Sequence, residues 1–457
     1  MNRSRFLGFR VIQLPVFYIL LVHAGTGWCQ SSGSAPTGEL LTLDRAVMLA
    51  LQNNRQVNNA ALEVGKSEDG IAAFKTKRLP AFKLDVTEAE PLTPIELKFK
   101  QGDLGSAPST GPIPATNTTI RTPRKPLTAI NSSITQPLLQ LYRIGLGIDQ
   151  LEVGRGINQE ELRSQRHLVI DNVKRTYYGL LQTQSSLDAV EESTTFYRGL
   201  DRLVEEYVKQ QTAFKYESLD VKTRLSKSES DALTLRNTLA SQREQLNKLL
   251  ARDIRTEFRV IPVPEMTEFE TDLPAAQAQA VRQRPEVNRA QLQIKYAEYD
   301  YKIKRAEYIP DLNLVLNYSS FITSEVLPKN ITFVGLQLSW EYFDWGRKSN
   351  EMAAKNKSIE QAKTSSSDLE SQVLLEVNSA YRKLQESRAA VRVGQLAQET
   401  QREMLRVTLN KYKDQAALLK DVLQVQASSA DANNQYQQAV LSLWTARADF
   451  EKAIGEE

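Results

Sequence analysis

The sequence contains one long segment twice, and this duplication limits the folds that are open to it. Residues 43–80 align without a gap with residues 273–310, at an offset of 230. A later stretch aligns at an offset of 204, so that Arg143 matches Arg347. A tandem repeat forms the same structural unit twice. We therefore expect two equivalent halves rather than the roughly three domains that a chain of this length would usually have.

The two offsets differ by 26 residues, which places one insertion between Pro80 and Gln136 of the first copy. The inserted stretch is rich in Pro, Gly, Ser and Thr, as exposed loops are. Each copy then has the order helix, strand, loop, strand, helix, helix. The expected divisions are a first repeat at 31–252 with an external loop at 91–126, a linker at 253–272 and a second repeat at 273–457.

Very long helices are predicted in both repeats. Proline is absent from 138–261 and from every position after Pro328. A proline inside a helix costs roughly 3 kcal/mol, so its absence permits continuous helix. Steps of three and four residues connect a seam of apolar and small side chains, typical of a coiled coil. The seam in the second copy contains Val377, Ala380, Leu384, Ser387, Val391 and Gly394.

Four segments of about ten residues alternate between apolar and polar side chains, as β-strands do. They cover 81–90, 127–137, 311–321 and 331–342. Ten residues is about the length with which a tilted strand crosses a bilayer. Four strands cannot close a membrane barrel, because the smallest such barrels have eight. A membrane location therefore requires several copies of the chain.

Aromatic residues gather near the ends of the second pair of strands. They fit an aromatic girdle at a membrane interface, and packing as an ordinary core where strand meets helix is the alternative. The candidate interface residues are Tyr318, Phe321, Trp340, Tyr342, Phe343 and Trp345.

The first residues have the pattern of an export signal, which we place at 1–30 with an uncertain cleavage site. A basic stretch with Arg3 and Arg10 precedes an apolar run that is too short and too interrupted to span a bilayer. Cys29 is the only cysteine, and Trp28 stands before it where a lipoprotein would have a small residue. We therefore expect no lipid attachment and no disulfide.

The composition argues against an enzyme. Only His167 follows the predicted signal, so zinc sites and histidine-assisted nucleophiles are not expected. No phosphate-binding loop is present, and we predict no catalytic residue, no metal and no cofactor. A net charge of +3 gives no indication of nucleic-acid binding.

Several short motifs, repeated in order, resemble the TolC-type outer-membrane efflux protein family. They are the opening at Leu43, the strand exit 136–138, the repeat close 246–250, and Tyr412 followed by 421–423. The resemblance covers nearly all of the chain after the signal. It implies a mainly α fold with a small β part: a long coiled-coil α-helical barrel plus four strands contributed to a trimeric 12-stranded transmembrane β-barrel. It also implies a homotrimer in the lipid of the bacterial outer membrane, its helices in the periplasm.

The same resemblance implies a gate at the periplasmic tip of the helices, narrowed by acidic side chains. The matching positions are Glu217, Asp220, Tyr412, Asp421 and Gln424, where Gln424 replaces a frequent second acid. The family also tends to have glycine where Gln211 and Gln415 stand. Because Glu217 and Asp220 are three residues apart, they share one helix face. An ordinary pair of solvated acids is the alternative.

The function predicted from these features is a passive exit duct. It would dock to a periplasmic adaptor (membrane fusion) protein and an inner-membrane pump, as part of a tripartite efflux or secretion system. A soluble periplasmic coiled-coil scaffold or adaptor is the alternative, with the same helices but no barrel. No sequence pattern selects the cargo, so drugs, metals, small metabolites and secreted proteins all stay open, as do the identity of the pump and the role of the loop.

Overall fold

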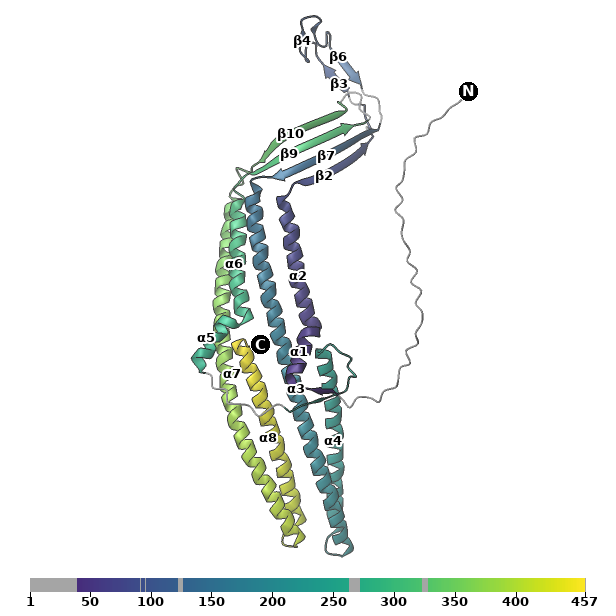
Figure 1. The fold of residues 1–457 in the computed structure, drawn as a ribbon, viewed down its shortest axis with the longest axis vertical. Helices are drawn as coiled ribbons and strands as arrows, with labels where there is room; N and C mark the ends of the chain where they lie inside the picture. Colours follow the sequence, from purple (N-terminus) through teal and green to yellow (C-terminus); the bar gives the residue numbers. More distant parts are fainter. Residues whose placement is uncertain are drawn as a thin grey trace, which may run out of the picture. The chain divides into compact units, whose positions relative to one another are not determined.

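The computed structural model describes residues 39–90, 92–94, 96–121, 126–262, 272–322 and 328–456. The predicted signal at 1–30, with Cys29, lies outside these residues, and so does the middle of the linker at 263–271. The ribbon is drawn in Figure 1, and its labels are used below.

The first half begins with a short strand, two helices and a 3-10 turn, and then continues through strands into two long helices. Its elements are β1 (Glu39–Leu41), α1 (Leu43–Asn53), α2 (Arg55–Lys75), η1 (Thr76–Arg78), β2 (Ala81–Ala89), β7 (Leu127–Pro137), α3 (Gln140–Lys209) and α4 (Lys215–Leu249). The second half follows the same order after the short strand β8 (Phe258–Val260). Its elements are α5 (Leu273–Gln283), α6 (Pro285–Ala306), β9 (Asp311–Phe321), β10 (Asn330–Ser339), α7 (Arg347–Lys413) and α8 (Leu419–Ile454).

The first helix of each half is broken at an equivalent residue, which the sequence reasoning did not foresee. Asn54 and Arg284 are extended, with ψ of 130° and 127°. In the second half Pro285 follows, and a residue before proline disfavours the helical region. In the first half the Asn54 side chain accepts the Gln56 N–H at 2.8 Å, which caps the new helix instead. Two different sequences thus produce the same bend.

Four strands form one antiparallel sheet in the order β10-β9-β7-β2, and Figure 1 shows them side by side. The register places Phe82 opposite Ile134, Ile134 opposite Leu316, and Leu316 opposite Val334. Because side chains alternate between faces, these four positions and their i±2 neighbours share one face. Strand β10 ends at Ser339, three residues before the predicted end at 342, so the aromatic residues from Trp340 onward follow the strand.

The inserted loop at 91–126 contains short strands of its own. They are β3 (Glu96–Phe99), β4 (Ser106–Ala107), β5 (Gly111–Pro112) and β6 (Thr118–Arg121). Strand β3 pairs with β6, and β4 pairs with β5, so the chain folds back on itself twice. We expected an exposed loop here. Thr and Ile in 118–121 nevertheless favour a strand, which can pair once the turn brings the two segments together.

The long helices pack as pairs within each half and also across the halves. Helix α3 has 70 residues and α7 has 67, which corresponds to about 100 Å of helix each. Helix α4 packs on α3, α8 packs on α7, and α3 contacts both α6 and α8 of the other half. Gly394 allows a close approach within the α7–α8 pair, because a Cβ there would lie 3.1 Å from the Tyr436 Cα.

Tyr177 on α3 fastens the short β1–β8 sheet to the long helices. Its side chain is fully buried, and its hydroxyl lies 2.8 Å from the Leu41 carbonyl and 2.7 Å from the Ile261 carbonyl. The same oxygen accepts the Ile261 N–H at 3.0 Å. Burial away from water raises the pKa of this hydroxyl, so it stays a neutral donor.

We predict that Tyr177→Phe lowers the free energy of unfolding by about 1 to 3 kcal/mol. The substitution removes the hydroxyl donor of the Leu41 and Ile261 carbonyls, and of these two the Leu41 carbonyl still accepts the Ile261 N–H at 3.2 Å. Urea unfolding followed by tryptophan fluorescence measures the change. The equivalent Tyr381→Phe is the control, since the Tyr381 hydroxyl makes no hydrogen bond within the described residues. An equal loss in both variants would contradict this account of Tyr177.

Candidate functional site: the helical tip and the strand–helix junction

Two helical turns form the tip, and both reverse the chain through a left-handed glutamine. Gln211 has φ of 62° and Gln415 has φ of 60°. Beyond each, the chain donates back into the helix that has just ended: Thr212 N–H to Tyr207 O at 2.9 Å, and Ala416 N–H to Lys411 O at 2.7 Å. This is the usual helix ending with a left-handed residue, for which glycine is normally chosen. The two glutamines therefore occupy strained backbone positions.

The two predicted gate acids at the turns act as helix caps. A Glu217 carboxylate oxygen accepts the Phe214 N–H at 2.8 Å, and an Asp421 oxygen accepts the Leu418 N–H at 3.1 Å. Each therefore satisfies a backbone donor at the start of α4 or α8, where negative charge is also favoured by the helix dipole. The structure does not gather these acids into a single cluster within one chain.

The other two polar gate positions are exposed. Asp220 accepts from Arg224 at 3.3 Å one turn along α4. Gln424 takes the equivalent place on α8 and is exposed without a carboxylate. Among the described residues, no group of three or more His, Cys, Asp and Glu side chains is placed to hold a metal ion.

Tyr412 lies inside the tip rather than on its surface. Its ring meets that of Tyr207 at 5.9 Å between centroids, with 61° between their planes. Burial, with the nearby Glu217 carboxylate and Tyr207, raises the pKa of Tyr412 to about 12. The tyrosine belongs to an apolar cluster that joins the two hairpins. The buried members of this cluster are Tyr197, Leu200, Val204, Val221, Tyr412, Leu419, Val422 and Leu423.

An ion-pair network that the sequence reasoning missed joins α3 to α8 farther along the helices. Lys174 donates to Glu451 at 2.7 Å, and Lys452 donates to Asp171 at 3.2 Å. Arg175 contacts both Asp171 and an α8 acid, Asp449. Burial alone would raise the pKa of Glu451, but the bonds from Lys174 and Arg447 outweigh it and lower the pKa. This network resists separation of the two hairpins.

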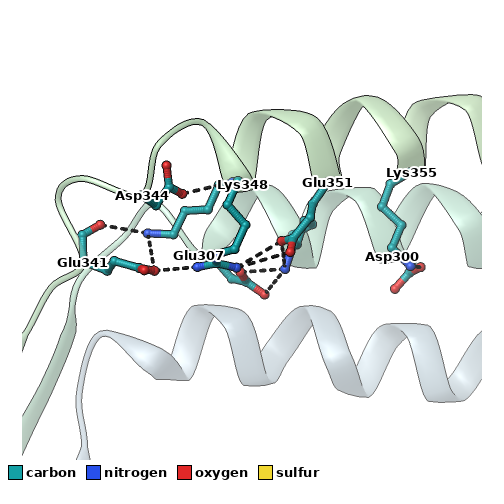
Figure 2. Close-up of polar contacts among 9 residues, drawn as sticks. Asp300, Glu307, Glu341, Asp344, Lys348, Glu351 and Lys355 are labelled. Carbon is teal, nitrogen blue, oxygen red and sulfur yellow. Dashed lines mark hydrogen bonds and ion pairs between the residues drawn. The ribbon is translucent and has the colours of Figure 1, made fainter.

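At the other end of the helices, ion pairs surround the junction of β10 with α7 (Figure 2). The Asp344 carboxylate accepts the Gly346 and Lys348 N–H groups at 3.1 and 3.0 Å, and these bonds lower its pKa. Lys348 is buried and donates to the Glu341 carbonyl at 2.9 Å. The carboxylate of Glu351 joins α7 to α6 through Lys304 at 2.6 Å. Charged side chains of α6 and α7 therefore hold the junction together.

The aromatic residues expected near this junction are exposed. Trp345 is 89% exposed and Tyr342 is 82% exposed. The Phe343 and Trp345 rings meet edge to face at 4.8 Å between centroids, and Trp345 is itself held at φ of 54°. Trp340 also lies exposed beside Tyr342, while Tyr318 and Phe321 stay on β9. Within the single chain, the four residues that follow β10 are not buried.

The sheet has one apolar face, and much of that face is open to solvent in the single chain. The opposite face is mainly polar, with Val315, Phe321, Ile331 and Phe333 among its apolar exceptions. None of the helices in the described part of the chain is both long and apolar enough to cross a membrane. The apolar face consists of Phe82, Leu84, Val86, Ile130, Ile134, Leu312, Leu314, Leu316, Tyr318, Val334, Leu336 and Leu338.

Solved structures of bacterial outer-membrane channels share this fold. The CusC structure has a TM-score of 0.76 at 14% identity, over 94% of this chain and 96% of that chain. The Campylobacter jejuni CmeC outer membrane channel has a TM-score of 0.73 at 15% identity, over 90% and 85%. The Vibrio cholerae outer membrane protein VceC has a TM-score of 0.71 at 13% identity, over 91% and 96%. The mainly α fold with a small strand part is therefore that of TolC-type channels.

The sequence of the second repeat agrees with this assignment. Residues 277–456 match the model of the outer membrane efflux protein family. A search of curated proteins finds no match. The resemblance drawn from the short motifs is confirmed by this match and by the shared channel fold.

We predict that Gln415→Gly stabilises the chain by about 0.5 to 1 kcal/mol. A left-handed position costs a non-glycine residue about 1 to 2 kcal/mol, and the greater flexibility of glycine when unfolded offsets part of the gain. Urea unfolding tests this. Gln210→Gly is the control: Gln210 lies one residue before the other turn at φ of −79°, so that variant is expected to lose stability. Equal losses in the two variants would show that Gln415 is not strained.

Proposed function

We propose that this chain is the outer-membrane exit duct of a tripartite efflux system, a passive conduit that opens at its helical tip. The observation that carries the proposal is the uncovered apolar face of the β10-β9-β7-β2 sheet. Its side chains on the two edge strands are about two-thirds exposed, such as Leu84 on β2 at 66% and Leu336 on β10 at 67%. An apolar patch of this extent needs a covering surface, and strands of 9 to 11 residues match the thickness of a bilayer.

We propose that three copies close the sheet. Strands β2 and β10 form its two edges, and each has one side without a strand partner. Lipid tolerates no open edge, because unpaired backbone groups cannot bond to water there. An antiparallel pairing of β2 with β10 of the next copy closes twelve strands with every apolar face outward. The exposed apolar residues Val393, Leu396 and Met404 on α7 support a second contact between copies along the helices.

The aromatic residues after β10 fit the boundary of the proposed membrane. Trp340, Tyr342, Phe343 and Trp345 follow the last strand residue. They are interspersed in the chain with Glu341 and Asp344 of the charged junction in Figure 2. Amphipathic rings favour the headgroup region, between an apolar layer and water. The helices would then extend into the periplasm.

The tip is proposed to receive the adaptor of the pump. Phe214 and Tyr216 stack at 5.7 Å between centroids, and both are about two-thirds exposed, as is Leu418 at the second turn. Exposed apolar side chains at a turn favour contact with a partner protein. Opening would separate the apolar cluster around Tyr412.

Leu336→Lys is expected to cost about 2 to 4 kcal/mol in a lipid-facing strand and to reduce the amount of folded protein in the outer membrane. Gln337→Lys, one residue on and facing the other side of the sheet, is expected to keep the wild-type amount. Fractionation with a heat-modifiability gel measures both. Recovery of wild-type protein in the soluble periplasmic fraction would contradict the duct and support the scaffold alternative.

The combined variant Glu217→Ala with Asp421→Ala is expected to change the single-channel conductance or cation preference of the reconstituted protein. Each substitution removes a helix cap, worth about 1 kcal/mol, together with a negative charge at the proposed entrance. Asp231→Ala, an exposed acid in the middle of α4, is the control. Channel behaviour identical to that of the wild type would contradict the proposed acidic gate.

A further inference from the structure

A cavity of about 360 Å³ lies between α3, α4 and the short strand β8, away from both the tip and the sheet. Leu180 and Leu239 are buried members of the adjoining core and form its apolar wall. Its polar wall contains Gln184, Arg243 and Arg259. Among the described residues, no aspartate or glutamate lines this cavity.

Both arginines of the cavity lack an ion-pair partner within the described residues. Arg243 is half-buried and Arg259 is exposed. The nearest acid along α3, Asp188, accepts the Gln184 side-chain N–H at 3.0 Å and does not line the cavity. Two guanidinium groups that share a wall repel each other, and an anion between or beside them relieves that repulsion.

The second repeat shows what this position looks like when its charge is satisfied. Arg447 on α8 is the equivalent of Arg243, at the offset of 204 that relates the two halves. Arg447 donates to Glu451 at 2.9 Å, one helical turn on. The first repeat has Asn247 in place of Glu451, so Arg243 has lost the carboxylate that its counterpart retains.

The Asn247 side chain instead holds the turn that leads to the second arginine of the cavity. It is fully buried, and its amide N–H groups donate to the Ile254 and Thr256 carbonyls, each at 2.9 Å. Its side-chain oxygen accepts from Arg252 at 2.6 Å. These bonds fix the turn that leads into β8, and β8 carries Arg259. One replacement thus frees Arg243 and positions Arg259.

We propose that this cavity binds an oxyanion, a carboxylate or a phosphate group of a small organic molecule. A guanidinium offers paired N–H donors that match two oxygens of such a group, and two of them provide a charge that no acid of the described part of the chain neutralises here. The Gln184 amide adds a polar contact, and the leucine wall accepts an apolar portion of the ligand. The volume is ample for a molecule of that kind.

The test uses the full chain purified in detergent and follows thermal unfolding by tryptophan fluorescence. Sodium phosphate and sodium butyrate are titrated separately against sodium chloride at constant ionic strength, which distinguishes the two anion chemistries. A ligand that binds only the folded state raises the Tm in a saturable way. We expect such a rise with at least one of the two anions. No saturable rise with either anion overturns the proposal.

Variants show whether the rise comes from this cavity. Arg243→Gln and Arg259→Gln are each expected to weaken the apparent affinity at least tenfold. Gln184→Glu supplies an internal carboxylate and is expected to abolish the rise without removing either arginine. Arg236→Gln is the matched control, because Arg236 lies two turns earlier on α4 and pairs with Glu191 at 2.6 Å. A rise of wild-type affinity in Arg243→Gln or Gln184→Glu also overturns the proposal.

Discussion

The unmet hydrogen bonds and the uncovered apolar side chains of one sheet govern the rest of this structure. Strands β2 and β10 each present an edge, and the face between them is apolar along all four strands. Water could satisfy the edges but not the face, whereas lipid could satisfy the face but not the edges. The proposed closure with further copies, with the apolar face outward, satisfies both. The duplication alone provides two strands in each half and cannot achieve it.

The helices and the charged junction anchor that sheet. Each strand runs directly into a helix, and the charged network around Lys348 and Glu351 ties β10, α6 and α7 together at that transition. At the far end the two turns combine carboxylate caps and left-handed glutamines with the apolar cluster around Tyr412. The proposed opening at the tip would have to separate this cluster.

Much of the fold could be predicted from the sequence because it depends on local patterns. Alternation in residues such as Phe82, Leu84 and Val86 indicates a strand, and the absence of proline after Pro328 permits the long helices. The break at Asn54 could not be predicted in the same way, because it depends on one side-chain cap. The equivalent break at Arg284 could have been predicted, because Pro285 follows that residue.

The candidate site was less accessible to sequence reasoning. The motif positions Glu217 and Asp421 lie at the tip turns, but their carboxylates bond to backbone N–H groups, which spacing alone does not reveal. Long-range pairs such as Lys174 with Glu451 connect residues far apart in the chain, so no local pattern marks them. Comparison of the two halves would have drawn attention to Asn247, where one copy keeps an acid and the other does not.

Native mass spectrometry of the protein extracted from outer membranes in mild detergent tests the central claim most directly. Closure of the sheet by its own edges predicts a species of three chains that persists when the detergent is exchanged. Extraction of only single chains or pairs from the outer membrane would contradict the account, because neither provides the partner strands that β2 and β10 require.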